Sequence, residues 1–219
     1  MRDDDIDDTD LLSSNSSLQD WSDAIAAASP TPAGGAVAAV AAALAAALVT
    51  MVAGLTIRRE KYVAVHSRAR ETLERAQALR DDLLDLAIED AIAVAEYMEA
   101  LGLPQGTEFE RTGREAAKRA ALIEAARVQI ELLHQSLEIA QMAEAMVGSG
   151  LASAIGDAAA ASFLATATSR CAYWSIRSNL KTIGRPEESR LLMDTAQSLL
   201  EQVERAEERV RLLLEDRVS

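Results

Sequence analysis

The sequence has little of what disulfide-rich proteins, metalloproteins and β-sheet proteins need. Its 219 residues include one cysteine, Cys171, which excludes a disulfide framework and a cysteine-based zinc site. Two histidines, His66 and His134, leave little for histidine-based metal chemistry, and we expect no metal site. Aromatic residues make up 3 % of the chain, whereas Ala, Leu and Glu are abundant, so the composition argues against a sheet protein. Apolar residues make up 49 %, which excludes disorder for the bulk of the chain.

Positive charge is also scarce. The 22 Lys and Arg stand against 35 Asp and Glu, and a net charge of -13 disfavours nucleic acid and anionic membrane surfaces as partners. The first ten residues hold six Asp and one Arg, and with the serine-rich run that follows they predict a disordered acidic tail over residues 1–17. Residues 18–219 are expected to form a single domain. Because the N-terminus is acidic rather than basic, we expect no signal peptide and a cytoplasmic protein.

Charge is absent altogether from Ser29 to Ile57. This stretch is long enough to span a bilayer, but it consists mostly of Ala and Gly, and Ala gains little from transfer to lipid. Pro30 and Pro32 break its front end. We therefore expect a buried helix of a soluble bundle, in which small side chains let neighbouring helices approach closely.

Helical periodicity dominates the rest of the chain, and no segment reads convincingly as a strand. Breaks at Gly and Pro divide the chain into about six helices. They are expected over residues 18–28, 36–56, 59–101, 107–147, 157–182 and 187–218. The predicted fold class is all-α, a bundle of long helices.

Asp90 is the acidic residue whose position is most informative. It follows Leu83 by seven residues and Leu86 by four, and it precedes Val94 by four, which places it on the inward stripe of its helix. A buried carboxylate needs either a partner or a function. Two interpretations stay open on spacing alone: Asp90 acts in a functional site, or it pairs with a basic residue of a neighbouring helix.

Each of two segments has two interpretations: it binds a ligand, or it has a structural role. The turn over residues 30–35 leads into a helix with Gly34 and Gly35, where free N–H groups suit an anion or a polar ring; it could equally be a helix connector. The segment over residues 58–62 places bases beside Tyr62, which suits a planar anionic ligand or a solvated helix start.

Polar residues of the next-to-last predicted helix have the same two interpretations. Asp157 lies near its start and is expected to be its N-cap. Arg177 and Lys181 could bind ligand carboxylates or complement the helix C-terminus, and Asn179 offers both donors and acceptors. The isolated residues His66, His134 and Cys171 are interpreted as structural.

Six short segments occur in an order and at spacings that are typical of one enzyme family. They are Pro30-Thr31-Pro32-Ala33-Gly34-Gly35-Ala36, Met51-Val52-Ala53-Gly54-Leu55-Thr56-Ile57, Arg58-Arg59-Glu60-Lys61-Tyr62, Asp90-Ala91-Ile92-Ala93-Val94, Gly156-Asp157 and Ser175-Ile176-Arg177-Ser178-Asn179-Leu180. With them the chain, from about Leu18 to its C-terminus, resembles the cyclodeaminase/cyclohydrolase family of folate one-carbon enzymes. This family comprises the cyclodeaminase domain of formiminotransferase-cyclodeaminase and stand-alone methenyltetrahydrofolate cyclohydrolases.

Several positions depart from the pattern of that family. The turn has Ala33 and Ala36 in place of a glycine and a serine, and Arg59 and Glu60 stand for two of three lysines. The loop Gly150-Leu151-Ala152-Ser153 stands for a Gly-Asn-x-Asn loop, Gly156 for a serine and Ser175 for an asparagine. These changes remove polar groups that should contact folate.

The resemblance implies an all-helical homodimer with active sites in a cleft near the dimer interface. The implied substrate is 5,10-methenyltetrahydrofolate, hydrolysed to 10-formyltetrahydrofolate, or 5-formiminotetrahydrofolate, cyclised with release of ammonia; no metal or redox cofactor is implied. Asp90 is the expected catalytic residue, accompanied by Lys61 and Asp157. The expected substrate-binding residues are Pro32, Gly34, Gly35, Arg59, Tyr62, Arg177, Asn179 and Lys181. The departures leave open an alternative, a non-catalytic folate-binding or structural helical dimer.

Overall fold

The structure is a computed structural model that describes residues 12–13, 15–183 and 186–218. All regular structure in these residues is helical, which confirms the predicted class. Six α-helices and two short 3-10 helices follow one another along the chain. They are α1 (Leu18–Ala26), α2 (Gly34–Ile57), η1 (Glu60–Val65), α3 (His66–Gly102), α4 (Glu108–Ser149), η2 (Ala152–Ala154), α5 (Ile155–Ile183) and α6 (Pro186–Val218).

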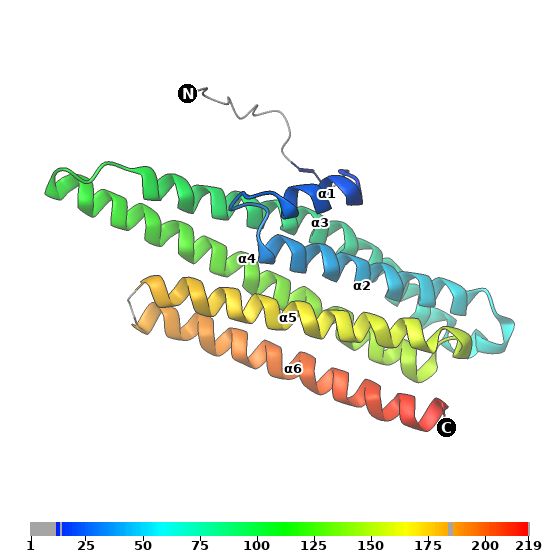
Figure 1. The fold of residues 1–219 in the computed structure, drawn as a ribbon. Helices are drawn as coiled ribbons and strands as arrows, with labels where there is room; N and C mark the ends of the chain where they lie inside the picture. The colour runs from blue at the N-terminus through cyan, green and yellow to red at the C-terminus, as the bar shows by residue number, and fades with distance from the viewer. Residues whose placement is uncertain (1–11, 14, 184–185, 219) are drawn as a thin grey trace.

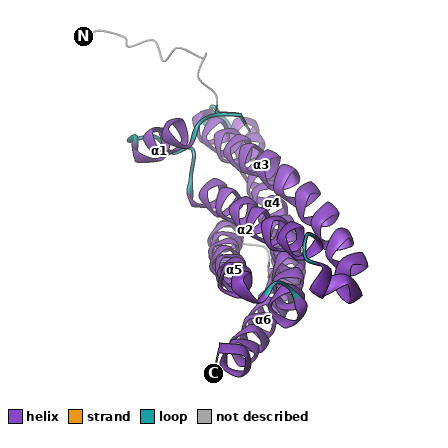
Figure 2. Cartoon of the chain, turned by 90° about the vertical axis from the view of Figure 1, so that its right-hand side faces the viewer, coloured by secondary structure: helices purple, strands orange, loops and turns teal. Residues whose placement is uncertain are grey.

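The long helices α2 to α6 run along the length of the molecule and form an elongated bundle (Figure 1). Successive long helices run in opposite directions (Figure 1). Helix α2 packs against α3 and α5, and α4 packs against α3, α5 and α6. The short helix α1 lies on the outside of the bundle, above the start of α2 (Figures 1 and 2). Its main anchor is Trp21, which is buried in the core.

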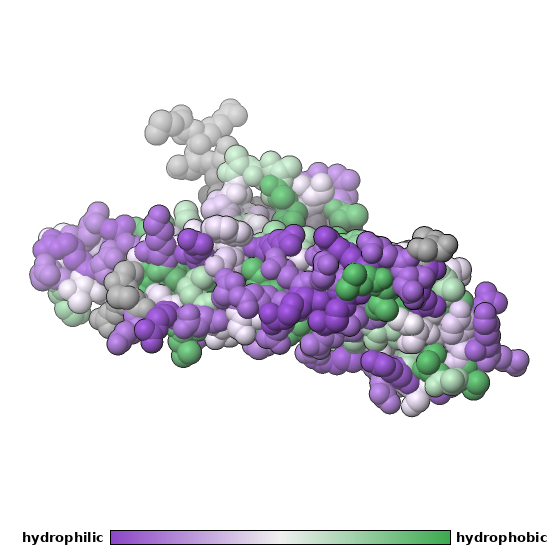
Figure 3. Space-filling model, turned by 90° about the horizontal axis from the view of Figure 1, so that it is seen from below, coloured by the Kyte–Doolittle hydropathy of each residue, from purple (hydrophilic) through white to green (hydrophobic). Residues whose placement is uncertain are grey.

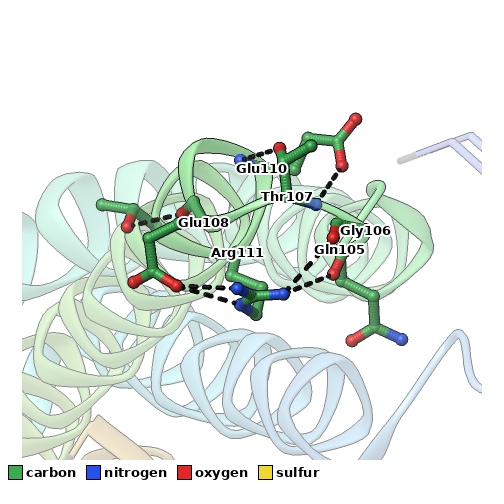
Figure 4. Close-up of polar contacts among 7 residues, drawn as sticks. Gln105, Gly106, Thr107, Glu108, Glu110 and Arg111 are labelled. Carbon is green, nitrogen blue, oxygen red and sulfur yellow. Dashed lines mark hydrogen bonds and ion pairs between the residues drawn. The ribbon is translucent and has the colours of Figure 1, made fainter.

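Local sequence signals explain where the helices begin. Ser17 and Asp20 form a capping box at the start of α1, and Thr107 and Glu110 form one at the start of α4. In the second box the backbone N–H of Thr107 donates to Glu110 at 2.7 Å (Figure 4). Arg111 adds hydrogen bonds to Glu108 and to two carbonyl groups of the preceding loop, so the α3–α4 connection is held by its own side chains.

The core is built largely from alanine. Ala side chains of α2, such as Ala42, Ala45 and Ala46, have no exposed surface, and larger residues such as Leu83 and Leu132 fill the space between the other helices. Because alanine is small, α2 can pack closely against both α3 and α5. The expectation of a core helix is thus met on one side of α2: 56 % of its most apolar window is buried, and most of its other residues are half-buried, with Val37, Leu44 and Met51 exposed.

Three helix boundaries differ from the predicted ones for identifiable reasons. Gly34 and Gly35 belong to the first turn of α2 and not to the preceding turn. The third helix begins at His66, because residues 60–65 form a 3-10 helix in which Tyr62 has non-helical dihedral angles. The last helix begins at Pro186 and not at residue 187, because the missing N–H of proline costs nothing in the first turn of a helix. The predicted tail lies mostly outside the described residues, and its disorder stays a prediction.

Charged residues cover the outside of the bundle, and the face seen from below is mostly hydrophilic (Figure 3). Ion pairs between described residues join neighbouring helices on the outside of the bundle. They are Arg75–Glu138 at 2.7 Å, Arg170–Glu204 at 3.0 Å and Arg209–Glu144 at 2.7 Å. Because most of these side chains are exposed, each pair contributes no more than about 1 kcal/mol to stability.

Candidate active site

The start of α2 meets α3 and α4 around the carboxyl group of Asp90. Asp90 is 4 % exposed, which confirms its inward position on α3. Gln129 of α4, also buried, donates from Nε2 to Asp90 Oδ1 at 2.6 Å. A Cβ atom placed on Gly35 would lie 2.3 Å from both of these atoms. The close approach of the three helices therefore requires glycine at position 35.

The Asp90 carboxyl group is electrostatically unusual, because no ion pair with it is found among the described residues. Burial raises the pKa of Asp90, and the hydrogen bond from Gln129 and the backbone amide of Ala36 oppose that rise. Two buried oxygen atoms, Asp90 Oδ2 and Gln129 Oε1, have no hydrogen-bond partner among the described residues. Such a group favours a bound cation or a proton, which would satisfy the unpaired oxygen.

A second group of predicted residues lies at the other end of α2. Tyr62 accepts a hydrogen bond from the backbone N–H of Ala152 at 3.1 Å, and Thr56 accepts one from Leu151 at 2.9 Å. These contacts tie η1 and the end of α2 to the loop between α4 and α5. Arg59 and Lys61 are exposed beside this junction.

Asp157 lies at the same end, in the first turn of α5. It is exposed and already inside the helix, so the prediction that it is the N-cap was wrong. From Gly35 to Ile57 the rise of α2 is on the order of 33 Å, since each residue adds about 1.5 Å. Within one chain the predicted catalytic residues therefore form two groups, with Asp90 at one end of α2 and Lys61 and Asp157 at the other (Figure 1).

The predicted residues of α5 lie in its last turns, in the half of the bundle where α2 begins (Figure 1). Arg177 and Lys181 are exposed and Asn179 is half-buried. The guanidinium carbon of Arg177 lies 4.9 Å from the ring centre of Trp174, a cation–π contact on the surface.

Pro32 lines a mostly apolar pocket of about 240 Å³ between α1 and α3. The pocket also includes Trp21, Ile88 and Ala91, and it adjoins the turn that carries Gly34. Gly34 itself is exposed, with open space where a Cβ atom would be. In the described residues no group of three or more Asp, Glu, His or Cys is placed to hold a metal ion.

Comparison with known proteins decides the family. The family model described as formiminotransferase-cyclodeaminase matches residues 17–211. A protein of Methylorubrum extorquens named methenyltetrahydrofolate cyclohydrolase is 34 % identical over 170 residues, which cover 78 % of this chain and 82 % of that one. The chain belongs to the formiminotransferase-cyclodeaminase family of folate one-carbon enzymes. The resemblance in its sequence motifs is confirmed.

Other members of the formiminotransferase-cyclodeaminase family agree with this assignment. The mouse protein named formimidoyltransferase-cyclodeaminase is 29 % identical over 167 residues, and the match spans 31 % of its length. A crystal structure named formiminotetrahydrofolate cyclodeaminase, from Thermotoga maritima, has a TM-score of 0.85 at 28 % identity and covers 94 % of this chain and 98 % of that chain. The helical arrangement described above is thus that of the family.

Gln129 is the residue of this family member's site that the motif analysis missed. It lies seven residues after Leu122 and four before Leu133, both buried, so the spacing alone placed it on the inward stripe of α4. Its two neighbours, Val128 and Ile130, are apolar, so the local pattern does not single out Gln129. The sequence signal that could have identified Gln129 is a polar residue on the apolar, alanine-rich face of its helix.

Proposed function

We propose that this chain hydrolyses 5,10-methenyltetrahydrofolate to 10-formyltetrahydrofolate. The observation that carries the proposal is the buried Asp90 carboxyl group, which has an unpaired oxygen and no cationic partner among the described residues. The reactive carbon of the substrate belongs to a cationic amidinium, so a bound substrate supplies the missing positive charge. The cyclohydrolase name of the relative at 34 % identity supports the same reaction.

The proposed reaction balances with water, substrate and one carboxylate. Asp90 Oδ2 accepts a proton from water as the water oxygen bonds to the amidinium carbon, giving a neutral tetrahedral adduct. The hydroxyl group of the adduct then loses its proton to solvent as its oxygen forms the C=O bond, the bond from that carbon to N5 breaks, N5 takes up the proton held by Asp90, and the formyl group stays on N10. The net products are 10-formyltetrahydrofolate and one proton released to solvent. This chemistry needs no metal or redox cofactor.

The remaining predicted residues have binding roles in this proposal. The backbone amides at Gly34 and Gly35, at the positive end of α2, face the bound ring, which Pro32, Tyr62 and Asn179 help to position. The glutamate tail of the substrate carries carboxylates that suit exposed bases. These bases are Arg59, Lys61, Arg177 and Lys181. Asp157 is the second acidic group of the proposed site, after Asp90.

Cyclodeamination of 5-formiminotetrahydrofolate is the second candidate. It is favoured by the similarity over nearly the whole length of the structure named formiminotetrahydrofolate cyclodeaminase. In that reaction N10 attacks the formimino carbon, and ammonia leaves after protonation. Both reactions pass through a tetrahedral carbon at the same place, so the same carboxyl group would serve each of them.

We further propose that the active form is a homodimer joined through α2 and α5. On α2 the exposed apolar residues Val37, Leu44 and Met51 recur every seven residues, and α2 has no charged residue. On α5, Phe163 and Trp174 are also exposed. Exposed apolar residues of this kind on two adjacent helices are typical of a subunit interface.

A two-fold axis at such an interface would join the two groups of site residues. If α2 pairs antiparallel with its copy about Leu44, the middle of the stripe, position 57 of one chain lies beside about position 31 of the other, because a two-fold pairs positions symmetrically about 44. The η1 end of one chain, with Lys61 and Tyr62, then lies near the start of α2 and Asp90 of its partner. The proposed site thus contains residues of both subunits.

An absorbance assay tests the proposed function. The purified chain should remove the near-ultraviolet absorbance of 5,10-methenyltetrahydrofolate faster than the spontaneous reaction. Release of ammonia from 5-formiminotetrahydrofolate, measured in parallel, assigns the second activity. The Asp90→Asn variant should lose the enzymatic rate while keeping its helical circular dichroism. A wild-type chain that accelerates neither reaction would contradict the proposal, and tight binding of folate without turnover would favour a binding protein.

A further inference from the structure

We propose that Gln129 is a positioning residue, which holds the Asp90 carboxyl group in the one orientation that the reaction uses. The catalytic part of this inference rests on the proposed function, whereas the pairing of the two side chains does not. Gln129 contacts no reacting atom and acts through Asp90.

The geometry of the pair leaves the carboxyl group little freedom. Gln129 Nε2 donates to Oδ1 at 2.6 Å, a short distance that is typical of a hydrogen bond to a charged acceptor. Gly35 closes the site from α2, since any side chain there would meet Asp90 Oδ1 and Gln129 Nε2. With Oδ1 engaged by Gln129, Oδ2 is the buried oxygen that has no hydrogen-bond partner among the described residues, and it is the oxygen left for the reaction.

Gln129 is costly as a core residue, which argues for a role besides packing. Its side chain is 2 % exposed, and its carbonyl oxygen has no hydrogen-bond partner among the described residues. An unsatisfied buried amide oxygen destabilises the folded chain, so an apolar residue of similar size would pack better at this position. The donated hydrogen bond is the one interaction of its polar group that the structure shows.

No charged side chain competes with Gln129 for the carboxyl group in the part of the chain that the structure describes. The packed helix α2 has no charge over its whole length. On α4, Arg127 pairs with Glu124 at 3.2 Å and Glu131 accepts from Gln135 at 2.9 Å, and all three charged residues face solvent. On α3 itself Glu89 is exposed. The amide of Ala36 and the Gln129 side chain are therefore the groups that favour the ionised carboxyl group.

A variant that removes the donor and keeps the shape tests the role. Gln129→Met should lower kcat about 10- to 100-fold, the penalty expected for a misplaced catalytic group, with KM within about threefold of wild type. Loss of a hydrogen bond to a charged group should also move the acid limb of the kcat profile up by about one to two pH units. Gln129→Asn, which keeps the amide but is one methylene shorter, gives a second variant if the first folds poorly.

Gln135 provides a matched control on the same helix. It is also buried, it also donates to a carboxylate and its Oε1 atom also lacks a partner among the described residues, but its acceptor is the exposed Glu131. Gln135→Met should leave kcat, KM and the pH profile near those of wild type. Equal losses in the two Met variants would overturn the positioning role, as would an unchanged profile in both Gln129 variants.

Urea unfolding across pH separates this inference from the proposed function. Asp90 has a raised pKa in the folded chain, so its contribution to the unfolding free energy falls as pH rises from about 3.8 through the folded pKa. Without the Gln129 hydrogen bond the folded pKa rises further, and this fall should extend about one to two pH units higher in Gln129→Met but not in Gln135→Met. An identical pH dependence in both variants would reject the pairing. Absence of turnover in wild type would instead reject the proposed function alone.

Discussion

The ionised form of the Asp90 carboxyl group is stabilised less by the folded chain than by water. Its pKa is raised above 3.8 by burial, so ionising the carboxyl group costs more free energy in the folded chain than in the unfolded chain. Asp90→Asn removes this cost, while its amide can still accept the hydrogen bond from Gln129. We expect the variant to lose enzymatic rate by about 10² to 10⁴-fold and yet to unfold at a higher urea concentration than wild type at pH 8.

The pH dependence of unfolding gives the sign of the stability difference between wild type and Asp90→Asn. Below pH 3.8 the Asp90 carboxyl group is protonated in both the folded and the unfolded wild-type chain, so its ionisation does not change the unfolding free energy. As pH rises through the folded pKa, the unfolding free energy of wild type should fall relative to that of Asp90→Asn. A variant that becomes less stable than wild type at pH 8 would mean that an unseen cation already pairs with this carboxyl group.

Gly35 and Gly34 are adjacent residues with opposite expected responses to a methyl group. Gly35→Ala places a Cβ atom 2.3 Å from Asp90 Oδ1 and Gln129 Nε2, so we expect a loss of about 1–3 kcal/mol in unfolding free energy together with a loss of activity. Gly34→Ala meets nothing within 4 Å, and the better helix propensity of alanine should leave stability equal or raise it by up to about 1 kcal/mol. Thermal unfolding of the two variants, compared with wild type, measures the difference; equal effects would mean that α2 shifts to accommodate the side chain.

Asp90 was predictable from sequence because its neighbours at four and seven residues are apolar. Gln129 was not found although its spacing from Leu122 and Leu133 places it on the inward stripe, because a polar residue between the apolar residues Val128 and Ile130 resembles a solvent-facing position. The glycine pair was predicted to be a turn because glycine is a poor helix former. The structure instead uses Gly35 inside the helix for a close approach, a tertiary requirement that local propensity does not contain.

At the level of helices, the end of α2 is joined to the α4–α5 connection by one buried hydroxyl group. Thr56 has no exposed surface; it donates to the carbonyl of Val52 and accepts from the backbone N–H of Leu151 at 2.9 Å. Thr56→Val keeps the shape but leaves that N–H without its acceptor, which should cost about 1–3 kcal/mol.

Thr50 of the same helix is the control for this change. Among the described residues its hydroxyl group bonds the carbonyl of Ala46 alone, one turn back, so Thr50→Val should alter stability by less than about 0.5 kcal/mol. Urea unfolding compares the two variants, and amide exchange at Leu151 should accelerate in Thr56→Val alone. Equal costs would show that this hydrogen bond does not hold the junction.

The helices themselves were largely predictable, because long amphipathic segments and their Gly and Pro breaks are local signals. The 3-10 helix η1 was not, since Tyr62 leaves the helical region only to reach the N–H of Ala152, 90 residues further along the chain. A contact of that separation depends on the assembled bundle.

For the whole molecule, the apolar face of α2 and α5 predicts how the chain associates. Leu44→Glu places a charge at the centre of this face and should convert a dimer into a monomer, as measured by light scattering after size-exclusion chromatography. Leu212 of α6 is equally exposed, at 57 % against 56 % for Leu44, so Leu212→Glu is a matched control that should remain dimeric. A Leu44→Glu chain with the mass of wild type would place the interface elsewhere.

The two separate groups of site residues lead to the most specific prediction for the assembly. If each site takes Asp90 from one subunit and Lys61 from the other, Asp90→Asn homodimers should be inactive and Lys61→Ala homodimers should lose most of their rate at substrate concentrations below KM. A heterodimer of the two variants has one site with both changes and one site with neither. Heterodimers isolated through two different affinity tags should therefore recover about half of the wild-type rate. If both residues act within one chain, each site of the heterodimer carries one change, and its rate should be as low as those of the homodimers.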